Sequence, residues 1–337
     1  MKEEPHINKR RHLVGLLCML LMIWIVPVKA QAAQAWAVID ADTGRLLLGE
    51  NEETKLPIAS LTKIWTAFTV MESGVPLGET TMSPEAAMSE GSSIYLPQGT
   101  KVQVESLLYG LMLRSGNDAA YALAEHAGGS VEGFVQLMNE KAVIYGLENT
   151  TFTNPSGLHD DAHLSTAYDT ALMMRYAMEN EQFKKIASTK NYTLKLPKET
   201  YHWQNKHRLL HSNPQAIAGK TGFTKTAGRT LVTYFEQDDK RIIVVTLNDG
   251  NDWQTHEALA AQIFSEYNKE MIARKGRYQF SPTIIGTLAA PIHVLLKDGE
   301  QTQLQHRAHL SRTSATGEWL VYLNGEPIVT RSITIEE

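Results

Sequence analysis

Two hydrophobic patterns alternate along the chain, one with the three-to-four-residue spacing of helices and one typical of strands. Helical spacing covers residues 60–73, 104–127, 131–145, 166–178 and 253–275. Runs rich in β-branched or apolar residues, typical of strands, cover 37–40, 45–48, 230–235 and 242–247. Because neighbouring strand runs are close enough in sequence to pair antiparallel, the mixture predicts an α+β domain.

The pattern changes after Gly276, where only short strand-like runs follow. These runs cover 294–296, 320–323 and 328–335. Asp298-Gly299 and Asn324-Gly325 are typical of two-residue hairpin turns. We therefore place a domain boundary near Arg277 and predict a main domain over 33–276 and a small β-rich module over 277–337.

The N-terminal segment has the layout of a secretory signal peptide. A basic head (Lys9–Arg11) precedes an apolar run of 16 residues (Leu13–Val28) and a stretch rich in alanine that starts at Ala30. A spanning helix needs about 20 apolar residues, which favours a cleaved signal over 1–32 and leaves an uncleaved anchor as the alternative. The sequence thus predicts export across the cytoplasmic membrane, with the mature protein secreted or associated with the cell wall.

Composition then excludes several classes of site and partner. Cys18, the only cysteine, lies inside the apolar run, so the mature chain cannot use disulfides, cysteine catalysis or thiolate metal sites. The full chain carries a net charge of −5, and removing the first 30 residues (five Lys/Arg, two Glu; net +3) leaves −8. An acidic exported protein is a poor partner for nucleic acid or anionic lipid.

Three short motifs carry the candidate chemistry. Ser60-Leu61-Thr62-Lys63 opens a predicted helix, Ser115-Gly116-Asn117 interrupts another, and Lys220-Thr221-Gly222 precedes a strand. Each alone has a structural explanation, since a serine at a helix start is most often an N-cap. Their order and context together favour one catalytic site.

The first motif pairs a nucleophile with a base. A serine hydroxyl is a weak nucleophile that needs a base, and Lys63 projects from the same helix face as Ser60. Free N–H groups at the helix start suit developing negative charge. To act as a base Lys63 must be neutral, and burial together with the charge of Lys220 would lower its pKa.

The other two motifs predict substrate contacts. Ser115 can relay a proton to a leaving amine, and the amide of Asn117 can hold the backbone of a peptide. Lys220 and Thr221 offer a charge and a hydroxyl to a terminal carboxylate. Gly222 lets the substrate approach its strand closely.

These motifs are those of the serine penicillin-recognising enzymes. Longer stretches resemble the low-molecular-weight D-alanyl-D-alanine carboxypeptidases, including Bacillus-like members that act on the spore cortex. The stretches are Ile58–Lys63, Leu111–Ala120, Asn154–Leu158, Gly219–Gly222, Asn248-Asp249 and Asn251–Trp253. The resemblance implies a transpeptidase/β-lactamase-like domain, with a five-stranded antiparallel sheet flanked by helices and Ser60 in the cleft between them. It also implies an oxyanion hole from the backbone N–H groups of Ser60 and Phe223.

Two departures from the family accompany the resemblance. Phe223 stands where some relatives carry histidine. The C-terminal module is short and shows no amphipathic helix near Ile335, so membrane contact is not expected once the signal is removed.

The expected activity is removal of the terminal D-alanine from peptidoglycan stem peptides through a Ser60 acyl-enzyme, with β-lactam antibiotics as inhibitors. A D,D-endopeptidase and a non-catalytic penicillin-binding wall protein remain alternatives. A class A β-lactamase ranks lower because no matching deacylating glutamate is evident between the second and third motifs.

Histidine-rich segments are the remaining candidates. His159 and His163 flank two aspartates as in a zinc site, but no third ligand is placed, so we predict a polar loop near the cleft and no metal or cofactor. The stretch with His202, His207 and His211 is expected at the surface. Trp65 is expected in the core.

Overall fold

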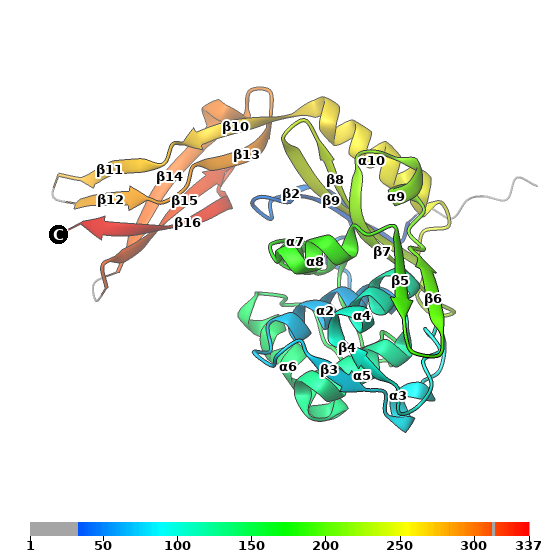
Figure 1. Cartoon of the computed structure of the whole chain (residues 1–337). Helices are drawn as coiled ribbons and strands as arrows, with labels where there is room; N and C mark the ends of the chain where they lie inside the picture. The colour runs from blue at the N-terminus through cyan, green and yellow to red at the C-terminus, as the bar shows by residue number, and fades with distance from the viewer. Residues whose placement is uncertain (1–32, 283, 312–313, 337) are drawn as a thin grey trace, which may run out of the picture. The chain divides into compact units, whose positions relative to one another are not determined.

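The computed structural model describes residues 33–282, 284–311 and 314–336, so the predicted signal segment and Cys18 lie outside the described residues. Its centre is a five-stranded, wholly antiparallel sheet in the order β2-β1-β9-β8-β7 (Figure 1). The strands are β1 (Ala35–Asp40), β2 (Leu46–Glu50), β7 (Ala216–Thr224), β8 (Gly228–Gln237) and β9 (Lys240–Leu247). The fold class predicted from the sequence is confirmed.

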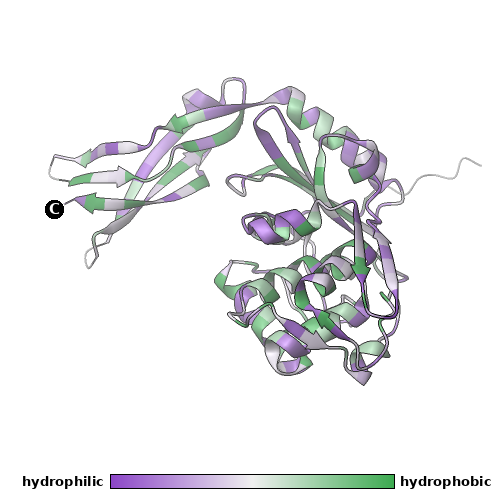
Figure 2. Ribbon diagram, in the orientation of Figure 1, coloured by the Kyte–Doolittle hydropathy of each residue, from purple (hydrophilic) through white to green (hydrophobic). Residues whose placement is uncertain are grey.

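Alternation along the inner strands supplies two apolar faces, each covered by helices. Ile39 and Val245 belong to the larger core, whereas Val38 and Val244 belong to the opposite one. The larger core is formed with α2 (Thr62–Met71), α4 (Val104–Tyr109), α5 (Asn117–Gly128), α6 (Val131–Ile144), α7 (Ala167–Met178) and α8 (Glu181–Ala187). The smaller core is formed with α9 (Leu209–Ser212) and α10 (Asp252–Glu266). Figure 2 shows hydrophobic residues concentrated around α2 and α4.

Short elements complete the domain around the helical layer. These are the 3₁₀ turn η1 (Ala59–Leu61), β3 (Glu79–Thr81), α3 (Pro84–Ala87), β4 (Lys101–Gln103), the π-helix η2 (Gly110–Arg114), β5 (Asn191–Lys195) and β6 (Thr200–Gln204). The π-helix and the left-handed Ser115 (φ 62°) break the predicted helix over 104–127 at the predicted interruption. Within the described ranges, no helix is long and apolar enough to cross a membrane.

The single helix predicted over 253–275 is wrong. Helix α10 ends at Glu266, and the chain continues as β10 (Tyr267–Ala273), which pairs with β13 (Ile292–Lys297). The buried Tyr267 donates its hydroxyl to the carbonyl of Leu47 at 2.9 Å. Pairing and burial therefore override the local helical spacing.

The C-terminal segment forms a second sheet with its own core around Trp319, in the order β11-β12-β16-β15-β14. Its elements are β11 (Gly276–Ser281), β12 (Ile284–Leu288), the turn η3 (Glu300–Gln303), β14 (Leu304–Leu310), β15 (Thr316–Leu323) and β16 (Glu326–Glu336). The hairpin predicted at Asn324-Gly325 is confirmed, with φ positive at both residues. The hairpin predicted at Asp298-Gly299 is wrong, because β13 pairs with β10 whereas β14 pairs with β15.

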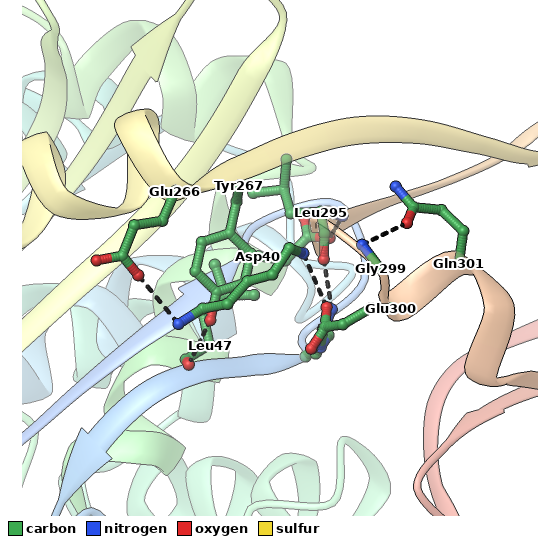
Figure 3. A network of polar contacts seen from close by, with 10 residues as sticks. Asp40, Leu47, Glu266, Tyr267, Leu295, Gly299, Glu300 and Gln301 are labelled. Carbon is green, nitrogen blue, oxygen red and sulfur yellow. Dashed lines mark hydrogen bonds and ion pairs between the residues drawn. The ribbon is translucent and has the colours of Figure 1, made fainter.

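A polar network joins the β1–β2 hairpin to β13 and η3 (Figure 3). Arg45 donates to the carbonyl of Leu295 at 2.5 Å and to both carboxylate oxygens of Glu300 at 2.9 and 3.0 Å. The buried carboxyl of Asp40 accepts the N–H of Leu295 at 3.1 Å, and burial raises its pKa. Charged groups at this junction are thus paired rather than exposed.

The loop after Asn154 packs against the turn that precedes α2. The side-chain oxygen of Asn154 accepts the N–H groups of Ser156, Gly157 and Leu158, which holds the loop in shape. Gly157 has φ +78°, and a Cβ there would overlap the carbonyl oxygen of Ala59. Only glycine allows this close approach.

We expect Arg45→Gln to lower the free energy of unfolding by about 2 kcal/mol, because Glu300 loses its charged partner in a place where water replaces it poorly. The Arg45 side chain is 9% exposed. Arg277→Gln is the matched control: Arg277 also pairs with a glutamate but is 65% exposed, so about 0.5 kcal/mol or less is expected. Urea unfolding measures both, and equal losses would contradict the role given to the junction.

We expect Gly157→Ala to cost about 3 kcal/mol or more and to displace Ser60, because the new Cβ meets backbone that cannot move alone. Gly74→Ala is the control, since Gly74 has φ +76° and no atom within 4 Å of the added Cβ. It should cost only about 1 kcal/mol, the cost of the left-handed backbone. The comparison is made by thermal unfolding, and similar losses in both variants would remove the steric argument.

Candidate active site

Ser60 lies on η1, directly before α2, on a turn fixed from both layers of the domain. From the sheet, Thr230 on β8 donates its hydroxyl to the carbonyl of Ile58 at 3.0 Å. From the helical layer, Thr62 donates to the carbonyl of Ala59 at 2.8 Å. Ala59 itself has φ 49°, which an alanine adopts only under constraint. The turn therefore presents Ser60 at a defined point.

Lys63 is fully buried, and its amine touches three groups from separate segments. Its Nζ lies 3.0 Å from Ser60 Oγ, 2.7 Å from Asn117 Oδ1 and 2.5 Å from the carbonyl oxygen of Ser156. Burial lowers the pKa of Lys63 well below its usual range, and the charge of Lys220 lowers it further. Residues of the first motif, the second motif and the Asn154–Leu158 loop thus all contact the Lys63 nitrogen.

Lys220 and Ser115 form the opposite side of the site. Lys220 donates to Ser115 Oγ at 3.0 Å and to the carbonyl of Thr221 at 2.8 Å, and both side chains are buried. Burial and the nearby charge of Lys206 lower the pKa of Lys220 to about 7. The side-chain amide of Asn117 donates to the carbonyl of Glu90 at 2.5 Å, which holds the Asn117 side chain in place.

A cleft of about 480 Å³ lies between these groups and β7. Ser60, Ser115, Thr221, Gly222 and Phe223 line it. Gly222 approaches Ser60 so closely that a Cβ there would lie 3.0 Å from the Ser60 nitrogen. The structure therefore brings all eight residues singled out from the three motifs and the position after them to one place, with the side chain of Phe223 66% exposed at the cleft wall.

Sequence reasoning missed several cleft residues. Lys206 and Arg229 add cations, and Arg229 pairs with the buried Asp252 at 2.5 Å and lies over the ring of Trp253. Asp252 and Trp253 belong to the Asn251–Trp253 stretch that carries part of the family resemblance, but the resemblance gave these residues no role in the site. Nothing local in the sequence distinguishes Lys206 or Arg229 from surface residues.

His163 is a buried structural residue. Its Nδ1 accepts the N–H of Thr153 at 3.1 Å, which leaves Nε2 to donate to Thr62 Oγ1 at 2.8 Å. Burial lowers its pKa to about 4, so the ring is neutral. His159 is exposed, and no group of three His, Cys, Asp or Glu side chains in the described ranges is placed to hold a metal ion.

The predicted surface position of His207 is wrong. Its side chain is 1% exposed, and Nε2 lies 3.1 Å from the carbonyl oxygen of Val232 and 3.0 Å from Thr233 Oγ1. The polar stretch around it folds into β6 and α9, and His207 packs against Gly219 of β7, a tertiary contact that local polarity cannot indicate. His202 and His211 are exposed as predicted, and Trp65 is buried as predicted.

Comparisons with known proteins agree with this geometry. Residues 25–251 match the peptidase S11 family model described as D-alanyl-D-alanine carboxypeptidase. The chain is 32% identical to D-alanyl-D-alanine carboxypeptidase DacF of Bacillus subtilis over 80% of this chain and 74% of that protein. It is 36% identical to DacC of Escherichia coli over 65% of this chain and 57% of that protein.

Solved structures extend the likeness to almost the whole chain. Penicillin-binding protein 5 of Haemophilus influenzae superposes with a TM-score of 0.75 at 25% identity, covering 93% of this chain and 98% of that one. D-alanyl-D-alanine carboxypeptidase DacD of Francisella tularensis gives a TM-score of 0.70 at 25% identity, covering 93% and 95%. The chain therefore belongs to the D-alanyl-D-alanine carboxypeptidase family of serine peptidases, which confirms the family and the enzyme class predicted from the motifs.

Proposed function

We propose that this protein removes the terminal D-alanine from peptidoglycan stem peptides, with Ser60 as the nucleophile. The observation that carries the proposal is the set of contacts around Lys63 Nζ. A neutral amine has two N–H donors and one lone pair. Asn117 Oδ1 and the carbonyl of Ser156 accept two hydrogen bonds, so the lone pair is left for the proton of Ser60.

Acylation then follows from the cleft. Ser60 Oγ attacks the carbonyl between the two D-alanines as its proton passes to Lys63. The backbone N–H groups of Ser60 and Phe223 receive the oxyanion, next to the start of α2. Ser115, hydrogen-bonded to Lys220, relays a proton to the departing amine of D-alanine, and its own hydroxyl is restored by the proton that Lys63 took from Ser60. Water hydrolyses the acyl-enzyme and restores Ser60.

Recognition of the terminal carboxylate of the substrate determines which peptide bond is cleaved. Thr221 lines the cleft beside Ser60, whereas the ammonium of Lys220 lies buried behind Ser115. Lys206 and Arg229 also line the cleft, and the side chain of Arg229 is 44% exposed although Asp252 pairs with one of its edges. We infer that these two cations and Lys220 supply the positive charge that holds the terminal carboxylate. The hydroxyl of Thr221 donates a hydrogen bond to the same carboxylate.

The same chemistry accounts for β-lactam inhibition. A β-lactam carbonyl placed over Ser60 would acylate the hydroxyl, and its ring amine stays tethered after the bond breaks. The complete set of contacts around Ser60 and Lys63 argues against the non-catalytic alternative. Stem peptides lie outside the cytoplasmic membrane, so the function requires the export that segment 1–32 predicts.

We expect Ser60→Ala to abolish both release of D-alanine and the covalent adduct with benzylpenicillin. Ser60 is half-buried, and within the described part of the chain its hydroxyl bonds only to Lys63, so stability should change by less than about 1 kcal/mol. Intact-mass spectrometry with peptide mapping locates the adduct, and thermal unfolding checks the fold. D-alanine release by the folded variant would contradict the proposal.

We expect Lys220→Gln to move the ascending limb of the pH profile for acylation to higher pH, by about one pH unit. The charge of Lys220 lowers the pKa of Lys63, so removing it raises that pKa and leaves less neutral amine at a given pH. Acylation by benzylpenicillin is followed by stopped flow from pH 5 to 10. Lys55→Gln, at an exposed lysine, should leave the limb in place. An unmoved limb in Lys220→Gln would show that the two amines are not coupled.

A further inference from the structure

A second hollow, of about 530 Å³, adjoins the catalytic cleft and has no part in the mechanism above. Three chain segments line both spaces with neighbouring residues. Ser92, Ser115 and Lys206 line the cleft. Ser93, Arg114 and Gln204 line the hollow. The hollow therefore continues the cleft along the same three segments.

Hydrogen bonds join these segments to one another. The N–H of Asn117 donates to the carbonyl of Ser92 at 2.6 Å, and the N–H of Lys206 donates to the carbonyl of Leu113 at 3.2 Å. The amine of Lys206 lies 3.4 Å from Ser92 Oγ. The wall between cleft and hollow is thus a continuous part of the fold, and β6 supplies the rest of the lining of the hollow.

Tyr95 lines the hollow in an unusual conformation. Its φ is 60°, which a bulky side chain rarely adopts, and the side chain is 77% exposed, so packing does not explain it. The buried carboxylate of Asp118 holds the backbone there, accepting the N–H groups of Ile94 and Tyr95 and the hydroxyl of Ser93 at 2.5–3.0 Å. The fold thus fixes the backbone that carries this exposed aromatic side chain.

Arg114 supplies a positive charge to the lining of the hollow. It lies at the end of the π-helix, half-buried, and within the described ranges its guanidinium has neither a hydrogen bond nor an ion pair to the protein. Partial burial lowers the pKa of the neighbouring Lys206, and the charge of Arg114 lowers it further. A half-buried guanidinium without an acidic partner in the described ranges favours an anionic group from a ligand.

We propose that this hollow binds the part of the stem peptide that precedes the two D-alanines, with Arg114 pairing with a free peptide carboxylate and Tyr95 packing against the peptide backbone. The inference rests on the proposed function. On the leaving side of the scissile bond the substrate ends at its terminal carboxylate, so only the acyl part extends beyond the cleft. That part carries a free carboxylate where glutamate is joined through its γ-carboxyl group.

Three synthetic substrates separate the carboxylate from the rest of the peptide. One is a pentapeptide with a free D-glutamate carboxylate, the second is the same peptide with that carboxylate amidated, and the third is diacetyl-lysyl-D-alanyl-D-alanine. D-alanine release gives kcat/KM for each. For the unaltered protein we expect the free acid to exceed the amide about tenfold, as one charge-assisted pair can supply.

Arg114→Gln should bring the acid-to-amide ratio close to one and leave the short substrate and benzylpenicillin acylation unchanged. Arg274→Gln, at an exposed arginine of the C-terminal segment, is the matched control and should keep the tenfold ratio. Tyr95→Gly should lower kcat/KM on both pentapeptides about threefold to tenfold but not on the short substrate. Because glycine accepts φ 60° without strain, the melting temperature of the Tyr95→Gly variant should not fall.

Distinct results would overturn the proposal. An acid-to-amide ratio that Arg114→Gln leaves unchanged would remove the carboxylate pair. Equal losses on the short substrate and on penicillin would make Arg114 a residue that acts on the catalytic centre. A Tyr95→Gly effect seen only when a disaccharide is attached would assign the hollow to the glycan strand. Failure of the proposed function looks different, since the unaltered protein would then release D-alanine from none of the substrates.

Discussion

The site depends on one physical constraint, the burial of the Lys63 amine in an uncharged state. Burial and the charge of Lys220 both disfavour the ammonium form. A neutral amine without hydrogen bonds would be costly to bury, and the fold supplies two acceptors, Asn117 Oδ1 and the carbonyl of Ser156. The same two contacts that make burial tolerable also orient the lone pair, so stability and catalysis share one arrangement.

The rest of the domain serves to bring three distant segments to that nitrogen. The sheet and the helical layer both bind the turn at Ile58–Leu61, through Thr230 on one side and through Thr62 on the other. Thr62 is in turn oriented by the neutral His163, which, like His207, is a buried imidazole with a structural role. The backbone at Ala59 stays in a strained region because bonds from both sides determine it.

Much of this was predictable because the motifs are local. The spacing of Ser60 and Lys63 on one helix indicates contact, and the turn-forming Ser115–Asn117 segment indicates a break in a helix. The carbonyl of Ser156 could not be predicted as a partner, since every residue has a carbonyl and only tertiary packing selects one. The same holds for Arg229 with Asp252, for the burial of His207, and for the strand at Tyr267–Ala273, where pairing with β13 replaces a helical pattern.

Asp118 connects the two spaces that this fold places next to each other. Its buried carboxylate is occupied by the loop that carries Tyr95, and the preceding residue, Asn117, contacts both Lys63 and the carbonyl of Glu90 in the same loop. The loop therefore cannot shift without disturbing the acceptor that keeps Lys63 neutral. A ligand in the hollow must fit the loop as it stands, because a buried carboxylate with several partners resists displacement. Recognition of the acyl part of the substrate and the position of the base are consequently set by adjacent residues of one helix start.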